Sequence, residues 1–151
     1  MERINTIRER IVECLRDTGL IKRIYGIVAR NVEAADLPVA IVAPTQVTDA
    51  EEGSELALTT ITYVITVLVH PADFGAEGEN EASTIALARA LLRHFRSRPG
   101  LETNSHPRGV VYNSVVSNRA PIQTISYGGQ EYLGTQITLE VMDLQSFEYE
   151  D

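Results

Sequence analysis

Apolar residues recur at helical spacing near the start of the chain, and the pattern stops at a glycine. The apolar positions are Ile4, Ile7, Ile11 and Leu15, each three or four residues after the last. This spacing places the side chains on one face of a helix, and Gly19 can adopt the left-handed conformation that ends one. The pattern predicts an amphipathic helix from about residue 2 to residue 18.

A second helical pattern runs from about Asn80 to Arg98. Acidic residues stand at the start of this segment and arginines at its end, so each sign suits the dipole of a helix there. Pro99 and Gly100 then end the predicted helix. Its apolar stripe consists of Ile85, Leu87, Ala88, Leu91, Leu92 and Phe95.

The other apolar segments alternate as β-strands do. Residues 59–70 carry no charged side chain, and their odd-numbered positions from Ile61 to Val69 are apolar while threonines fill half of the even-numbered ones. This alternation predicts a core strand with one face against the helices and the other face less buried. Further strands are predicted at about 21–30, 38–43, 109–118 and 131–144.

Polar segments separate these elements. Residues 44–56 are polar and acidic with Gly53 among them, and they predict a protruding loop or an exposed hairpin arm. Gly128 and Gly129 predict a hairpin turn with positive φ. Residues 143–151 are predicted to form a short acidic tail.

The predicted order of elements is α-β-β-β-α-β-β. A chain of 151 residues without internal repeats fits one domain that can bury its own core. Few, long strands beside two helices favour the α+β class, with one antiparallel β-sheet and both helices packed on one face.

Charge is unevenly distributed along the chain, which has a formal net charge of -8. There is no Lys or Arg between Arg30 and Arg89, whereas many acids lie there. Such a chain is not suited to high-affinity binding of nucleic acid. Two interpretations of the acids stay open, since they either keep loops soluble or line a passage through which DNA slides without sticking.

Candidate chemistry is sparse. Cys14 falls on the predicted apolar stripe, which favours a buried thiol over a catalytic one. His70 and Asp73 end a predicted strand as a candidate ligand or acid-base pair, but neither His94 nor His106 completes a metal-ligand spacing. Five serines lack the context of an activated nucleophile, namely Ser83, Ser105, Ser114, Ser117 and Ser126. We therefore expect no enzyme activity, no cofactor and no metal.

Neither a membrane span nor a secretion signal is expected. The longest apolar runs are about ten residues, well short of the roughly 20 that cross a bilayer. The first ten residues, MERINTIRER, lack the apolar core of a signal peptide. The sequence thus predicts a protein that stays in the cell where it is made.

Five segments bear a family resemblance when taken together. They are the first helix, the strands LPVAIV and ITYVITVLVH, the helix ASTIALARALLRHF and the final strand LGTQITLEV. In this order they resemble the tail terminator (tail completion) proteins of long-tailed bacteriophages. The resemblance covers nearly the whole chain and concerns the order of elements rather than invariant residues.

The resemblance implies a structural virion protein of the tail neck, assembled in the host cytoplasm. Such proteins form a homohexameric ring that caps the tail tube protein, ends tube polymerisation and joins the tail to the head connector or stopper protein. The fold it implies is an α+β sandwich with sheets toward a lumen through which DNA passes without sequence-specific binding.

By position in that fold, two sets of residues become candidates. Asp49, Glu51, Glu52 and Glu55 are candidate lumen or partner contacts, and Arg89, Arg93 and Arg96 are candidate inter-subunit contacts. Two alternatives stay open. One is another ring-forming neck or tail-tube component of the virion, and the other is a small metabolic enzyme or ligand-binding domain.

Overall fold

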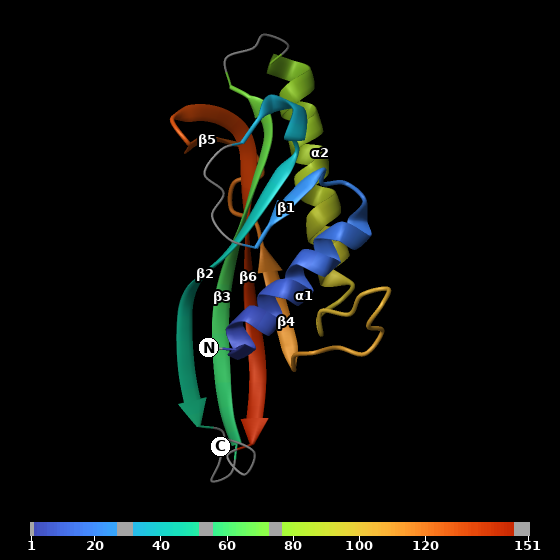
Figure 1. The fold of residues 1–151 in the computed structure, drawn as a ribbon, viewed down its shortest axis with the longest axis vertical. Helices are drawn as coiled ribbons and strands as arrows, with labels where there is room; N and C mark the ends of the chain where they lie inside the picture. Colours follow the sequence, from blue (N-terminus) through green and yellow to red (C-terminus); the bar gives the residue numbers. More distant parts are fainter. Residues whose placement is uncertain (1, 27–31, 52–55, 73–76, 147–151) are drawn as a thin grey trace.

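A computed structural model describes residues 2–26, 32–51, 56–72 and 77–146, in which two helices lie on one side of a six-stranded sheet (Figure 1). The α+β class predicted from the sequence is confirmed. In chain order the elements are α1 (Glu2–Thr18), β1 (Arg23–Tyr25), a 3-10 turn (Ala34–Asp36), β2 (Val39–Glu51), β3 (Leu56–Pro71), α2 (Glu77–Arg96), β4 (Asn113–Ser117), β5 (Gln123–Tyr127) and β6 (Gln130–Ser146).

The sheet has the strand order β1-β2-β3-β6-β4, and β5 pairs with the first part of β6. All pairs are antiparallel except β1 with β2, which is parallel. The sheet is therefore mixed, which corrects the prediction of an antiparallel one. The parallel pair is only three residues long, and the chain between its strands includes residues 27–31, which lie outside the described residues.

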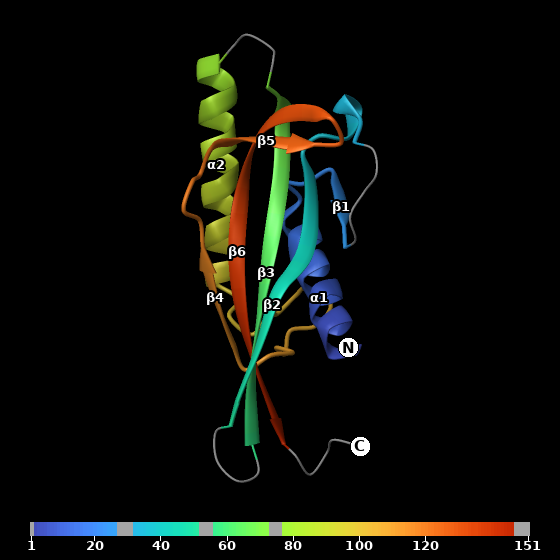
Figure 2. The ribbon, with the colours of Figure 1, turned by 90° about the vertical axis from the view of Figure 1, so that its left-hand side faces the viewer.

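One face of the sheet forms the main core. Along β3 the predicted inward positions Ile61, Tyr63 and Ile65 are at most 1% exposed. The apolar stripes of α1 and α2 both pack on this face, through Ile7, Ile11, Leu15, Leu91 and Phe95. Because burying each such side chain contributes about 1.5–3 kcal/mol, this shared core holds both helices on the same face. Figure 2 shows the two helices behind the strands.

A smaller apolar cluster lies on the opposite face, at the end of the sheet where β5 crosses it (Figure 2). Val39, Leu68 and Tyr132 are buried there, and Ile125 and Tyr127 of β5 pack on them. Strand β5 was not predicted. Its five residues alternate between half-buried and exposed positions and contain one aliphatic side chain, so the pattern is faint.

The turn between β5 and β6 is as predicted. Gly128 has φ 59° and Gly129 has φ 82°, and the flanking residues Tyr127 and Gln130 pair with each other. Positive φ at both central residues is the conformation of a two-residue hairpin turn that matches the twist of the strands.

Of the two predictions for residues 44–56, the exposed hairpin arm is confirmed and the loop is wrong over most of the segment. Strand β2 continues to Glu51 and β3 begins at Leu56, so residues 44–51 form one side of a long hairpin. At the end of the sheet away from β5, residues 49–51, 56–59 and 143–146 no longer pair with β4 and extend past the helices as a three-stranded β arm (Figures 1 and 2). Pro44 obscured this strand, but a strand edge tolerates proline because no partner needs its missing N–H.

Three other boundaries shift. The strand predicted at 21–30 is described only over Arg23–Tyr25, and the one at 109–118 is shortened to Asn113–Ser117. Of the predicted acidic tail, residues 143–146 belong to β6, and residues 147–151 lie outside the described residues.

Candidate functional site

The face of the sheet opposite the helices is covered by neither helix. Its lower part consists of rows of paired residues that run from β2 through β3 and β6 to β4. We call this surface the open face. Its described residues are Ala43, Gln46, Thr48, Leu58, Thr60, Thr62, Val64, Thr66, Asn113, Val115, Ser117, Gln136, Thr138, Glu140, Met142 and Leu144.

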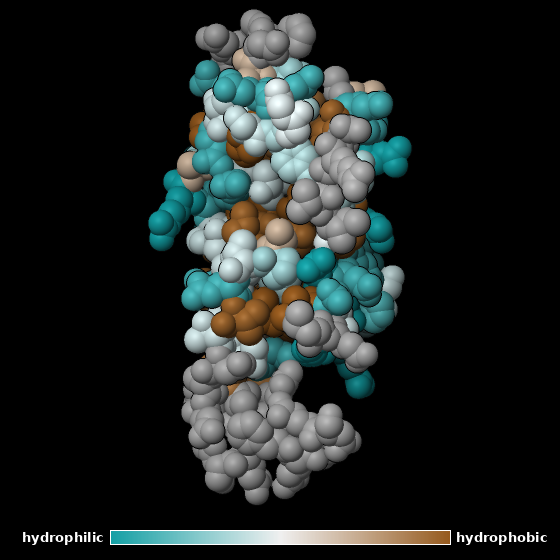
Figure 3. Space-filling view, turned by 60° about the vertical axis from the view of Figure 1, so that its left-hand side comes forward, coloured by the Kyte–Doolittle hydropathy of each residue, from teal (hydrophilic) through white to brown (hydrophobic). Residues whose placement is uncertain are grey.

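The open face is nearly uncharged and mixes threonine and amide side chains with apolar ones. Strand alternation sends the threonines of β3 to this side, where they are half-buried. Figure 3 shows residues of apolar and intermediate hydropathy over the middle of this side and hydrophilic residues mainly toward its margins. Strands β2 to β6 contain no Lys or Arg, and Glu140 is the charged residue among the described positions of the open face. Such a surface offers phosphate groups no cation to bind.

The four acids predicted as lumen or partner contacts lie on the β arm or beyond the described residues. In the backbone, Asp49 pairs with Thr59 and Glu51 with Ala57, at the end of the β2–β3 hairpin. Glu52 and Glu55 lie outside the described residues. The first two acids therefore belong to a strand, not to a loop. Asp49 lies at the base of the β arm, in the row of Thr59 and Asp143 beside the start of α1, and Glu51 lies farther out along the arm.

The three arginines predicted as inter-subunit contacts lie on α2, on the side away from the sheet. Arg89, Arg93 and Arg96 are exposed, whereas the opposite stripe of α2, which includes Ala88 and Phe95, is buried. The arginines and the arm acids thus lie on different layers of the molecule. Contact between the two sets requires a second molecule.

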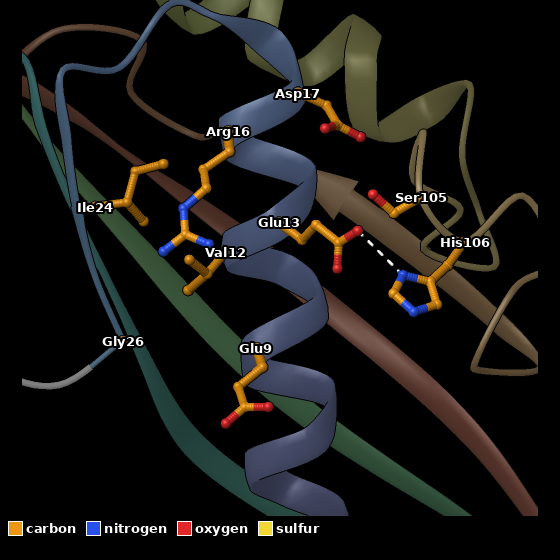
Figure 4. A pocket seen from close by; sticks show the side chains of 9 residues that line it. All are labelled: Glu9, Val12, Glu13, Arg16, Asp17, Ile24, Gly26, Ser105 and His106. Atoms are coloured by element: carbon orange, nitrogen blue, oxygen red, sulfur yellow. Dashed lines mark hydrogen bonds and ion pairs between the residues drawn. The ribbon is translucent and has the colours of Figure 1, made fainter.

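A cleft of about 750 Å³ runs along the outer side of α1, between β1 and the segment that follows α2 (Figure 4). Glu9, Glu13 and Asp17 of α1 point into it, and His106 approaches from the far side. Imidazole Nδ1 of His106 lies 3.0 Å from Oε1 of Glu13. The helical periodicity of the sequence identifies the side of α1 that faces away from the core. It does not identify the segment of the chain that contacts this side.

Glu13 and Asp17 fasten the 101–111 segment to α1. The Thr103 hydroxyl donates to Glu13 Oε1 over 2.7 Å, and the backbone N–H of Asn104 donates to Asp17 Oδ2 over 2.8 Å. The bond from Thr103, followed by the bond and charge of His106, lowers the pKa of Glu13 below its ordinary value. These contacts join residues about 90 positions apart, so sequence spacing gave no signal for them.

The cleft has the chemistry of a structural contact rather than of a catalytic centre. Two of its carboxylates, those of Glu13 and Asp17, already accept hydrogen bonds from the 101–111 segment. Within the described residues no group of three His, Cys, Asp or Glu side chains is arranged to hold a metal ion.

His70 and Ser83 form the one histidine–serine contact in the described part of the chain, with 2.8 Å between Nε2 and Oγ. The Ser83 hydroxyl also lies 3.1 Å from the carbonyl oxygen of Asn80, to which it donates. Since that hydroxyl proton is engaged, the imidazole N–H donates to Ser83 and does not activate it as a nucleophile. Asp73, the predicted partner of His70, lies outside the described residues.

Cys14 is fully buried between α1 and the 101–111 segment, as its place on the apolar stripe predicted. Burial raises the pKa of its thiol to about 12. A thiol with such a pKa has almost no thiolate at neutral pH and is a poor nucleophile. The pKa of His94 is lowered, first by burial and then by nearby Arg98.

Comparison with known protein families finds no family model that matches this chain, and comparison with curated proteins finds no match either. Among the helices of the described residues, none combines the length and the apolar character that crossing a bilayer requires.

Proposed function

We propose that the protein is a ring-forming terminator of a long bacteriophage tail. In this role several copies, about six by the family resemblance, close into a ring on the last layer of the tail tube and stop its growth. The ring then presents its other side to the head connector or stopper protein. The protein acts as a structural part of the virion and needs no cofactor.

The observation that carries this proposal is the open face. Both helices cover one side of the sheet, and the other side is left to solvent as a wide surface without lysine or arginine. A protein that lines a DNA passage benefits from a wall that does not attract phosphates, because each cation that bound one would slow transit. Figure 3 displays the side of the molecule that faces the lumen in this arrangement.

The β arm supports the same proposal from a different direction. It extends past the helix layer, so it reaches beyond the body of its own subunit (Figure 1). An extension of this kind suits contact with a neighbouring ring or with the tube below. Asp49 and Glu51 lie on it, in rows of the sheet that alternate with those of the open face, which is why we assign them to a partner.

The test begins with purified protein in light scattering and negative-stain microscopy. We expect a closed ring of about six copies with a central hole, either alone or after addition of the tail-tube protein from the same particle. With tubes present, the protein should appear at one end only and should shorten the tubes as its concentration rises. A monomer that ignores growing tubes would contradict the proposal.

The same experiment separates the terminator from other ring-forming parts of the virion. A tube component polymerises into long tubes by itself, whereas a terminator forms closed rings and no tubes. A neck component binds the connector but leaves tube length unchanged.

A further inference from the structure

Two strand edges of the sheet are unpaired in the described structure. On one side, β1 pairs only with Val39, Ala40 and Ile41, so the rest of β2 to Glu51 pairs with β3 alone. On the other side, β4 pairs with β6 alone. An unpaired edge presents a row of backbone N–H and C=O groups that can accept a further strand.

The two edges differ in how they are protected. Near β1, the β2 edge carries Pro44 and a bulge at Thr45, which are devices that block strand addition. From Gln46 to Glu51 the pairing register is regular again. Strand β4 has neither proline nor charge in its sequence NSVVS, and Val115 on it is 50% exposed. The β4 edge is thus uncharged, and the regular stretch of the β2 edge, which is of similar length, carries its two acids, Asp49 and Glu51, toward its end.

The directions of the two edges suit each other. Successive antiparallel pairs from β2 through β3 and β6 to β4 make β2 and β4 run in opposite directions. When copies are related by rotation about an axis along the strands, every strand keeps its direction. The β4 edge of one copy then meets the β2 edge of the next copy as an antiparallel partner.

The two edges also lie at the same position along the direction of the strands. Gln46 pairs with Thr62, Thr62 pairs with Glu140, and Glu140 pairs with Val115. Partners in adjacent strands share a face, so Gln46 and Val115 are the two ends of one row on the open face. A neighbour placed by rotation alone brings Val115 of one copy beside Gln46 of the next, and a shift of two residues along the strand brings it beside Thr48 on the same face. With Val115 opposite Thr48, antiparallel pairing sets the whole of β4 against residues 46–50, clear of Pro44.

We propose that β4 of one copy pairs with residues 46–51 of β2 in a second copy, head to tail. Repetition of this contact joins the sheets of all copies into one closed antiparallel wall with the open faces on the inside. Closure leaves no unpaired edge at this level of the ring. The inference rests on the proposed function, because the pairing is the contact that closes its ring.

A second copy is a better occupant than an unrelated strand. Both halves of the contact are present in one chain, with matching direction and face and with heights that agree within two residues. A strand from another protein would satisfy one edge and leave the other exposed on each copy. Head-to-tail pairing satisfies both edges with a single rotation.

Cysteine cross-linking of the full-length protein tests the pairing. Paired residues of adjacent strands have Cβ atoms close enough for a disulfide. We would combine Val115→Cys with Gln46→Cys in one chain, and in a second chain with Thr48→Cys to allow for a shift of two residues. Wild type is the baseline because its cysteine is buried. Val115→Cys combined with Ser126→Cys on the exposed part of β5 is the matched control.

After mild oxidation, we expect a ladder of covalent oligomers from at least one of the two test variants, and none from wild type or the control. Cross-linking by Val115→Cys alone would indicate two-fold pairing of β4 with itself and would overturn the head-to-tail contact. A ring without any edge cross-link would overturn the inference and leave the proposed function standing. A protein that neither cross-links nor recognises tail tubes would overturn both.

A charge on the edge provides a second readout. Val115→Lys should raise the concentration needed for half-assembly at least tenfold without changing the melting temperature, because lysine on an edge opposes strand addition. Thr124→Lys on β5, which is also exposed, is the control and should assemble normally. Unchanged assembly of Val115→Lys would contradict the pairing.

Discussion

Arg3 in the first turn of α1 donates two hydrogen bonds to the carboxylate of Asp143 in β6, which lies 140 positions later in the sequence. Nε and Nη2 of Arg3 lie 2.6 and 2.8 Å from the two carboxylate oxygens, and Nη2 also donates to the carbonyl oxygen of Val110. Asp143 is 3% exposed. The pair thus closes the core at the point where the sheet leaves the helix layer.

Loss of Arg3 should destabilise the protein measurably. Arg3→Met removes the cation that binds the buried carboxylate of Asp143. We expect the free energy of unfolding to fall by about 1–3 kcal/mol. The figure is below that of a fully buried pair because the Arg3 side chain is 37% exposed. Urea denaturation measures it. Arg23→Met is the control, since Arg23 pairs with Asp36 at the surface and its loss should cost less than about 1 kcal/mol. Equal losses in the two variants would contradict the role of the Arg3 contact.

Glu13 should make the attachment of the 101–111 segment sensitive to acid. The folded state lowers the pKa of Glu13 from 4.5, so its contribution to stability is complete above about 4.5 and is lost as the pH falls through the lowered pKa. Glu13→Gln should therefore melt earlier than wild type at pH 6, and the gap should shrink once the pH falls below 4.5 and close below the lowered pKa.

Thermal melts of both proteins over a pH series provide the measurement. Glu9→Gln, one turn earlier on the exposed side of α1, is the matched control. It should follow wild type at every pH. A gap between Glu13→Gln and wild type that does not change with pH would point to a steric effect.

Gly134 is a site where no side chain fits. A Cβ atom there would lie 2.1 Å from the carbonyl oxygen of Val67, next to the irregularity in the β3–β6 pairing. Gly134→Ala should therefore cost about 3 kcal/mol or more, as the backbone cannot move without breaking the pairing. At Gly26 the nearest atom to an added Cβ is 3.5 Å away, on the side chain of Arg8. Gly26→Ala should change stability by less than about 0.5 kcal/mol. Chemical denaturation of both variants checks the difference.

The sequence predicted those features that depend on local periodicity. The stripes of α1 and α2, the two faces of β3 and the Gly128–Gly129 turn each follow from residues within one element or turn. The sequence could not predict how the elements meet. Arg3 with Asp143 is an example, since neither residue has a local pattern that identifies its partner. Strand β2 was truncated at Pro44 because proline usually ends a strand, and only the sheet shows that this strand lies at an edge.

In the candidate site too, local patterns predicted some features, and others depend on how the strands meet. The open face was foreseen as the threonine side of residues 59–70, because alternation alone separates the two faces. Its width was not foreseen, since it depends on which strands flank β3. The free edges of β2 and β4 could not be read from sequence at all, as an edge is defined by the absence of a neighbour.

Removal of the four acids at the arm should affect assembly without affecting the fold. The change is Asp49→Asn with Glu51→Gln, Glu52→Gln and Glu55→Gln. If the acids contact the tail tube or the next subunit, we expect capping of tubes to weaken by about tenfold, which corresponds to about 1.4 kcal/mol of lost contact.

Tube length in negative-stain images, measured against protein concentration, gives the capping strength. The control removes the same charge elsewhere, through Gln substitutions at the exposed positions Glu9, Glu33, Glu81 and Glu131. Both variants should melt close to wild type, because exposed charges contribute little to stability. A charge effect without specific contact would weaken capping equally in both variants. Weakening in the arm variant alone would place the partner at the β arm, and normal capping by both would exclude these acids from the contact.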